Sequence, residues 1–262
     1  MVEDVAVWLG VLERSHHRLT GLARELDEQQ LRAPSYCDDW SIAQVLSHLG
    51  SGAEIVGAAV AAVAAGERPP SRDTYPAVWD RWNAMSPREM RDQGLAADEG
   101  YVVLLQRLGS VLDKLELTLF GGMRLDGVGL VGARLSEHAV HTWDVTVALD
   151  PYARVAPDAV SLLVDRLPRI GTRLGTPAHV ERPTPLVVGI VTAEPDRRFD
   201  LRVDDAVSLT PDDKGPPQPE ELHLPAEALL RLAYGRLDPA APDVEPAERS
   251  TLETLQRVFR GF

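Results

Sequence analysis

The sequence predicts a two-domain chain, with an all-helical bundle over residues 1–150 and a smaller mixed α/β domain over residues 151–262. Three observations lead to this prediction. The chain has 262 residues, which is long for one hydrophobic core and comfortable for two small ones. Up to about residue 149 the apolar residues recur at helical spacing. Beyond Asp150 and Pro151, two β-branched runs of strand length appear.

In the first domain, each expected helix has its own signal. Leucines and valines spaced by three, four or seven predict a first helix over 4–26. Ser41 can cap a second helix that runs to about residue 65. Ser86, followed by Pro87 and by Glu89, has the sequence pattern of a capping box, which predicts a helix start at Pro87. The expected helices therefore cover 4–26, 41–65, 76–85 (short), 87–95, 101–119 and, after a break at 120–123, 127–149.

The second domain mixes helix and strand signals. A helix start is expected in 156–167, and strands are expected in the runs PLVVGIVTA (185–193) and FDLRVDDAV (199–207). The segment 211–221 is expected to form a loop. Two further helices are expected, over 224–237 with Pro225 near its start and over 247–262.

Composition narrows the possible functions. With 27 basic and 40 acidic side chains, the formal net charge of −13 would repel a phosphate backbone or an anionic lipid surface. No apolar run approaches the roughly 20 residues that span a bilayer, and the first residues lack the basic flank of a secretory signal. We therefore expect a cytoplasmic protein that binds neither nucleic acid nor membrane. Cys37, the one cysteine, rules out a cysteine-rich zinc site, and its own role stays open.

The residues with the most chemistry lie on the expected helix 127–149. Arg134, Glu137, His141 and Asp144 step by three, four and three, so they share one helix face beside apolar residues. Glu137 and His141, at i and i+4, are suited to bind one metal ion. A third ligand must come from another helix, and His48 is the best candidate. A core histidine bonded to a carbonyl or carboxylate would have the same spacing.

Two motifs carry a family resemblance. They are Trp40-Ser-x-x-x-Val45-x-x-His48-Leu and Glu137-x-x-x-His141-x-Trp143-Asp144. Both resemble motifs of the mycothiol-dependent maleylpyruvate isomerase family, which belongs to the larger DinB-like group. The segments WNAMSPREM (82–90) and LHLPAEALLRLAYGRL (222–237) also resemble parts of these proteins, so the likeness covers nearly the whole chain.

The resemblance implies a fold and a set of site residues. It implies a DinB-like four-helix bundle with zinc, or another divalent metal, on His48, Glu137 and His141, followed by a sterol-carrier-like α/β domain. It also implies that Arg236 binds a substrate carboxylate, for which a guanidinium fork is suited. Arg236 could instead interact with a helix dipole, and Arg231 is the alternative arginine. Asp144 could orient a histidine ligand or be a plain surface aspartate.

The expected function follows from the open fourth position of such a site. Two imidazoles and a carboxylate leave room for an external thiol, which the metal would deprotonate. We expect a zinc-dependent enzyme that activates a low-molecular-weight thiol, mycothiol by resemblance, for addition or transfer to a small electrophile. The alternatives are a thiol-independent metal hydrolase and a non-catalytic metal-containing binding protein. The protein is expected to be a monomer or a homodimer.

Overall fold

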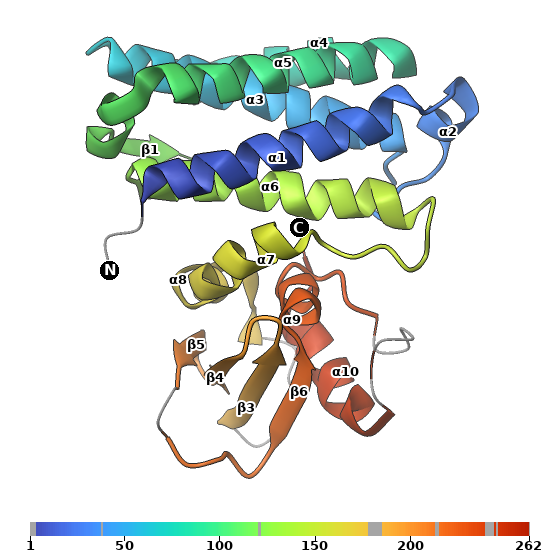
Figure 1. Ribbon diagram of the computed structural model, residues 1–262, viewed down its shortest axis with the longest axis vertical. Coiled ribbons are helices and arrows are strands. Elements are labelled where there is room, and N and C mark those ends of the chain that lie inside the picture. Colours follow the sequence, from blue (N-terminus) through green and yellow to red (C-terminus); the bar gives the residue numbers. More distant parts are fainter. Residues whose placement is uncertain are drawn as a thin grey trace. The chain divides into compact units, whose positions relative to one another are not determined.

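The computed structural model describes residues 4–37, 39–119, 122–177, 185–212, 215–238, 244 and 246–261. The chain divides into two compact units, Met1–Ala159 and Val160–Phe262. The first is helical apart from a small hairpin, and the second combines helices with a sheet (Figure 1). The predicted fold class, a helical domain followed by an α/β part, is confirmed.

Four long helices form the first unit within the described residues. They are α1 (Val5–Arg24), α3 (Ile42–Ala64), α5 (Pro87–Leu108) and α6 (Gly127–Val147). Helix α1 contacts α5 and α6, and α3 contacts the same two helices, so the four close into a bundle (Figure 1). Shorter elements connect them: α2 (Glu28–Arg32), α4 (Tyr75–Asn83) and the hairpin of β1 (Leu117–Leu119) and β2 (Met123–Leu125).

The helix starts follow the predicted capping signals. Ser41 accepts a hydrogen bond from the Gln44 backbone N–H and completes a capping box at the start of α3. Ser86 and Glu89 form the same reciprocal pair at the start of α5, with Pro87 in the first turn. Such pairs satisfy N–H groups that have no partner inside the helix, so they fix where each helix begins.

Helix α5 differs from the prediction of two helices over 87–95 and 101–119. It runs unbroken from Pro87 to Leu108, because Gly100 lies on its exposed side without strain and nothing between the two segments stops the helix. Gly109 ends it with a positive φ of 49°. Residues 117–119 then form strand β1 instead of a last helical turn. One consequence is that Asp98, which the prediction left in a break, lies on the buried face of α5.

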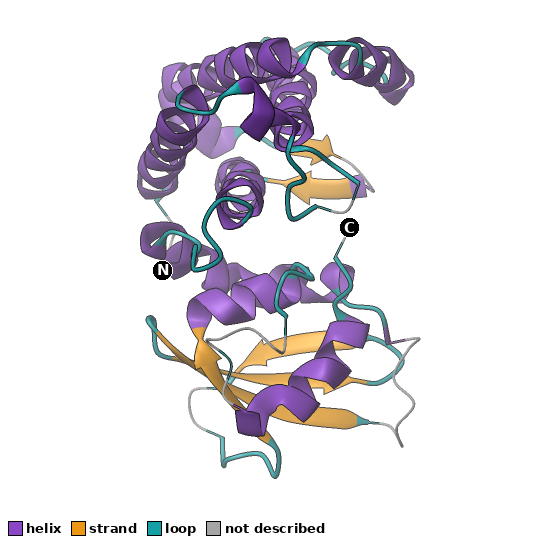
Figure 2. Ribbon diagram, turned by 90° about the vertical axis from the view of Figure 1, so that its right-hand side faces the viewer, coloured by secondary structure: helices purple, strands orange, loops and turns teal. Residues whose placement is uncertain are grey.

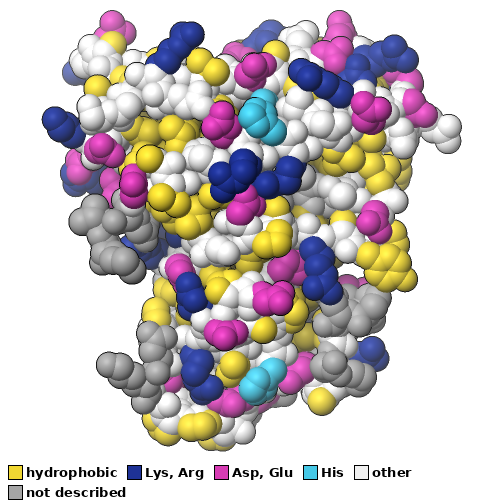
Figure 3. Space-filling view, in the orientation of Figure 1, with side chains coloured by type: hydrophobic (Ala, Val, Ile, Leu, Met, Phe, Trp, Pro, Cys, Tyr) yellow, Lys and Arg dark blue, Asp and Glu magenta, His cyan; other side chains and the backbone are white. Residues whose placement is uncertain are grey.

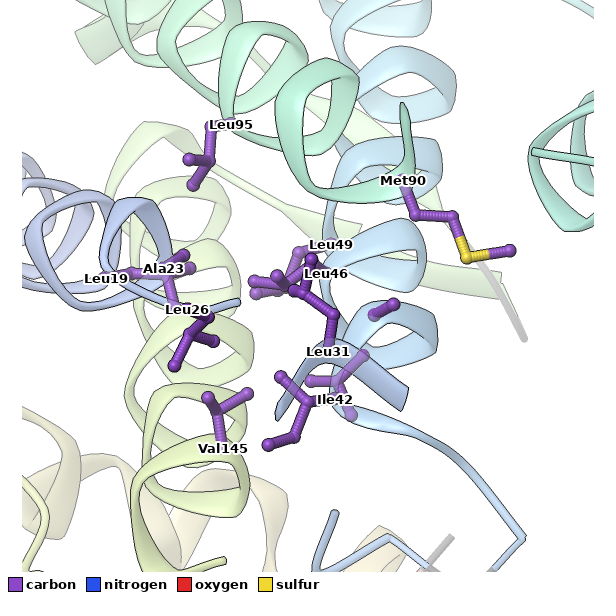
Figure 4. Close-up of a cluster of buried hydrophobic side chains, with 12 residues drawn as sticks. Leu19, Ala23, Leu26, Leu31, Ile42, Leu46, Leu49, Met90, Leu95 and Val145 are labelled. Carbon is purple, nitrogen blue, oxygen red and sulfur yellow. The ribbon is translucent and has the colours of Figure 1, made fainter. Parts of the chain in front are cut away.

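The bundle core is aliphatic at its centre. Leu19, Leu46 and Val145 come from α1, α3 and α6 and are at most 1% exposed. Figure 4 shows them in one cluster with Leu31 of α2 and Leu95 of α5. Side chains from five helices therefore share one core, which places α3 and α6 against common neighbours.

Helix α3 is the one described helix that is long and apolar enough, by length and composition, to cross a membrane. In the bundle 56% of its most apolar window is buried. Core helices of bundles pass the same test, so this feature is weak evidence for a membrane span.

The second unit contains a four-stranded sheet within the described residues. Its strand order is β5 (Val207–Pro211), β4 (Arg197–Val203), β3 (Leu186–Ala193) and β6 (Glu221–Pro225). The first three pair antiparallel, whereas β6 pairs parallel to β3. The remaining helices are α7 (Pro157–Leu163), α8 (Leu167–Leu174), α9 (Ala226–Ala233) and α10 (Arg249–Val258). Helices α8 and α9 contact the sheet, and Figure 2 shows helices lying along the strands of this sheet.

Surface charges are mixed in sign. On the face seen in Figure 3, acidic and basic side chains are interspersed over both units. The Arg14–Asp158 pair, at 2.9 Å, is one of several exposed ion pairs of this kind. Exposed pairs contribute little to stability, so the burial of the helix faces must hold the bundle together.

One carboxylate is buried among charged and polar partners. Asp98 is 1% exposed, and its two oxygens contact the guanidinium of Arg134 and the rings of His16 and His138. Burial alone would raise the pKa of the Asp98 carboxyl, but His138 and Arg134 outweigh burial and hold it well below its usual range. Burial lowers the pKa of His138, so the permanent positive charge facing Asp98 is that of Arg134.

We expect Gly94→Ala to destabilise the bundle. A Cβ at Gly94 would lie 2.6 Å from the main-chain oxygen of Leu46, so α3 and α5 would have to move apart. The expected loss in the free energy of unfolding is about 1–3 kcal/mol. Gly100→Ala, on the same helix with nothing within 4 Å, should instead add up to about 1 kcal/mol through helix propensity. Urea unfolding measures both, and equal effects of the two substitutions would contradict the close contact.

We expect Asp98→Asn to remove an acid-sensitive part of the stability. Because the pKa of Asp98 is lowered in the folded chain, its contribution is complete above the unfolded value of about 4 and is lost as the pH falls through the folded pKa. At neutral pH the substitution should cost about 3 kcal/mol, since it leaves Arg134 without its counter-charge. The difference from wild type should shrink below about pH 4. Asp113→Asn, at an exposed residue, is the control, and a difference that stays constant with pH would contradict the expectation.

Candidate metal centre

Helices α3 and α6 bring His48, Glu137 and His141 together. Glu137 and His141 are one helical turn apart on α6, and His48 faces them from α3. The Nε2 atom of His48 lies 3.1 Å from Glu137 Oε2, and Nε2 of His141 lies 3.5 Å from the same oxygen. Their candidate ligand atoms all lie within 4.8 Å of one another. The three residues predicted as ligands therefore converge on one point.

The spacing of these atoms fits a metal ion. Zinc–ligand bonds of about 2.0–2.1 Å in a tetrahedron place neighbouring ligand atoms about 3.3 Å apart. The observed 3.1 and 3.5 Å lie on either side of that value. Two imidazole nitrogens and one carboxylate oxygen also form a donor set that suits zinc and similar divalent ions. The residues present thus fit the ion that the resemblance implies.

Asp144 orients one of the histidines. It is fully buried, and its Oδ2 lies 2.8 Å from Nδ1 of His141. When Nδ1–H donates to this carboxylate, the lone pair of Nε2 is left on the side of Glu137, where an ion would bind. The alternative of a plain surface aspartate is wrong for Asp144, because none of its surface is exposed.

Cys37 lies beside the candidate site, close to the Nδ1 atom of His141. Its Sγ donates to Oδ2 of Asp144 at 3.1 Å and lies 3.9 Å from Nδ1 of His141. The sequence left the role of Cys37 open. Only the fold reveals the contact, because Cys37 precedes α3 and is more than a hundred residues from its partners in the chain.

Hydrogen bonds and charges within the candidate site shift the pKa values of His141 and Glu137 in opposite directions. Burial opposes charge on His141, but hydrogen bonds with Asp144, Cys37 and Glu137 outweigh it and raise its pKa well above the usual range. Burial likewise raises the pKa of Glu137, yet His141 and His48 overcome this and hold it well below its usual range. Because 48% of the Glu137 side chain is exposed, water attenuates the latter effect. Without a metal, an ionised Glu137 therefore faces a protonated His141.

One side of the site is open. The side chains of His48 and Glu137 are 38% and 48% exposed, whereas that of His141 is only 11% exposed. The ring of Trp40 borders the site, with its centroid 5.2 Å from that of His48. The candidate site is thus partly exposed on the side of His48 and Glu137, unlike a closed structural site.

The three arginines considered in the sequence have different surroundings. Arg236 follows α9 in the second unit, is 9% exposed, and donates from Nη1 to the carbonyl of Tyr234 at 2.6 Å. Arg231 pairs with Glu227 at 2.8 Å. Arg134, which was expected on the same helix face as Glu137 and Asp144, contacts Asp98. Nothing in the sequence pattern indicated Asp98, although a helix continuing through 96–100 would have placed it in register with Leu95, Val102 and Leu105.

A second group of possible ligands does not have metal-site spacing. His16, Asp98 and His138 also lie within 4.8 Å of one another. However, Asp98 Oδ2 is only 2.5 Å from His16 Nδ1 and 2.7 Å from His138 Nε2. The contact with His16 is a hydrogen bond, and the contact with His138 is a close ion-pair contact without hydrogen-bond geometry. Both distances are short for two atoms that bind one ion, so this cluster is a polar network around Asp98.

Comparisons with known proteins agree with the motif resemblance. The family profile described as "Mycothiol maleylpyruvate isomerase N-terminal domain" matches residues 12–146. Two solved structures, of the mycothiol-dependent maleylpyruvate isomerase and of a histidine-to-alanine mutant of it, are similar to this chain. Each is 12% identical with a TM-score of 0.64, and the match covers 89% of this chain and 90% of the other.

At 12% identity, the two structures establish the shared fold. No curated protein sequence matches this chain. The matched profile covers more than half of the chain and includes all three candidate ligands, His48, Glu137 and His141. The resemblance first inferred from two short motifs is thereby confirmed, and the chain belongs to the mycothiol maleylpyruvate isomerase family.

Proposed function

We propose that this protein is a zinc-dependent, mycothiol-dependent isomerase. The observation that carries the proposal is the convergence of His48, Glu137 and His141 on one point with an open side, within a domain of this family. An ion bound there would lower the pKa of a bound thiol, so that a thiolate is available at neutral pH. No protein cysteine is needed as the nucleophile.

The protein's own residues have distinct tasks in this proposal. His48 and His141 offer neutral Nε2 lone pairs, and Glu137 offers a carboxylate charge. Asp144 keeps the proton of His141 on Nδ1, so that Nε2 stays available. Trp40 and the exposed edge of Glu137 border the side from which a thiol and its electrophile can approach.

Isomerisation of a double bond is a reaction that a thiolate can catalyse, because a thiolate can add to the bond and be eliminated again. A thiolate that adds to a cis double bond turns it into a single bond, which can rotate before elimination returns the trans product and the thiolate. Maleylpyruvate, the substrate in the name of the similar enzyme, is the first candidate. Transfer of the thiol onto an electrophile needs the same activated nucleophile but consumes the thiol.

We also propose that Arg236 binds a carboxylate of the substrate. This proposal rests on the family resemblance and on the planar guanidinium, which can donate two hydrogen bonds to a carboxylate.

We expect purified protein to contain about one zinc per chain. His48→Ala and His141→Ala should weaken zinc binding by at least about 100-fold, because outer partners of a metal ligand alone are worth roughly 10- to 100-fold. His223→Ala, which removes an exposed histidine of the second unit, should leave zinc binding unchanged. Elemental analysis and a competition titration with a chromogenic chelator measure this. Wild-type protein that binds no divalent metal would overturn the proposal.

We expect turnover of maleylpyruvate to require both the metal and mycothiol. Removing zinc with a chelator should abolish turnover, and adding zinc back should restore it. The thiol concentration should stay constant during the reaction if the enzyme is an isomerase, and it should fall in step with product if the enzyme is a transferase. Metal-dependent turnover without any thiol would favour a hydrolase, and metal and thiol binding without turnover of electrophiles would favour a binding protein.

A further inference from the structure

A buried polar network joins all four long helices of the bundle. Its centre is Asp98 on α5, which contacts His16 on α1 and both Arg134 and His138 on α6. Arg134 also donates to the main-chain carbonyl of Leu49 on α3, at 2.9 Å. We call these four side chains, together with the Leu49 carbonyl, the Asp98 network. It lies outside the proposed metal centre and has no assigned role.

The network is almost completely shielded from solvent. The side chains of Asp98, Arg134, His16 and His138 are 1%, 7%, 6% and 0% exposed. Asp98 Oδ1 accepts from Nη2 and Nε of Arg134 at 2.5 and 3.2 Å, and Oδ2 faces the two histidines. Burying such groups costs stability unless each has a partner in a fixed geometry. The network can therefore form in only a narrow range of helix positions.

The same residues lie next to the metal ligands in the chain. His138 directly follows Glu137, and Arg134 lies one turn before it on α6. Leu49, whose carbonyl Arg134 binds, directly follows His48 on α3. Arg134 thus connects the backbone beside one ligand with the helix that carries the other two. A slide of α3 along α6 would break the contact with Leu49 and would change the distance between His48 and Glu137.

We propose that Asp98 is a positioning residue for the metal centre: it holds the Arg134 fork, and Arg134 sets the register of α3 against α6 and so the separation of His48 from Glu137 and His141. This inference rests on the proposed function, because it concerns the same metal centre. It adds a role for a residue on α5 that contacts none of the three ligands through the bonds described here. If the proposal is right, a substitution in the Asp98 network changes the coordination geometry of the bound metal and lowers the metal affinity.

The test uses the full chain loaded with Co²⁺, whose visible absorption reports coordination geometry. Asp98→Asn keeps the shape of the side chain but removes its charge, and Arg134→Lys keeps a positive charge but loses the planar fork. We expect both variants to bind Co²⁺ and Zn²⁺ up to about 10-fold more weakly, the lower end of the range for direct partners of metal ligands because neither residue contacts a ligand, and to show a shifted or weakened Co²⁺ spectrum. Arg134→Lys covers the case in which Asp98→Asn does not fold.

The matched control is Leu105→Ala, which truncates a fully buried side chain on the same helix as Asp98. It should lower the melting temperature while leaving metal affinity and the Co²⁺ spectrum as in wild type. If Asp98→Asn and Arg134→Lys lose only stability, as Leu105→Ala does, the network is a stability element alone and the inference is overturned. A second equivalent of metal in wild type that is lost in Asp98→Asn would overturn it as well, by making the network a metal site. If wild-type protein binds no metal, the proposed function itself is wrong, and this outcome can be told apart from a failure of the present inference alone.

Discussion

The contacts of Arg134 connect three helices that are far apart in the chain. Its guanidinium pairs with Asp98 on α5 and donates to the Leu49 carbonyl on α3, while its own backbone belongs to α6. A buried guanidinium tolerates few arrangements, because each N–H must find an acceptor in a fixed plane. Aliphatic packing around Leu46 and Val145 brings the helices together, but hydrophobic contacts are not directional. The buried ion pair therefore supplies the register that the candidate metal site requires.

Helix α6 serves two different purposes on adjacent faces. Arg134 and His138 point into the closed network, where every charge is neutralised inside the protein. Glu137 and His141 point to the half-open side, where they face His48. The contacts around Asp98 Oδ2, at 2.5 and 2.7 Å, are shorter than the 3.1 and 3.5 Å among the candidate ligand atoms. Helix α6 is thus held in position through the face of Arg134 and His138, while the adjacent face with Glu137 and His141 stays partly exposed to solvent.

The candidate ligand His141 has two supporting partners, Asp144 on its own helix and Cys37 from the segment before α3. Asp144, one turn later on α6, accepts its Nδ1–H, and Cys37 donates to the same carboxylate oxygen. Both partners polarise the ring and fix its orientation, which improves the Nε2 lone pair as a metal donor. The segment before α3 also donates from the Tyr36 backbone to the carbonyl of Asp144. Cys37, whose role the composition left open, therefore supports the orientation of the candidate ligand His141.

The sequence by itself determined the helix starts at Ser41 and Ser86, the change from helix to strand after residue 150, and the pairing of Glu137 with His141. These features depend on neighbours within one or two turns, and a local pattern records such neighbours completely. Family motifs, not spacing, added His48. Only the tertiary structure decided that α5 is one helix, that β6 pairs parallel to β3, and that Asp98 and Cys37 meet residues of α6. Their partners lie tens of residues away, and the free energy of a buried carboxylate or a shared hydrogen bond depends on which groups the fold brings to it.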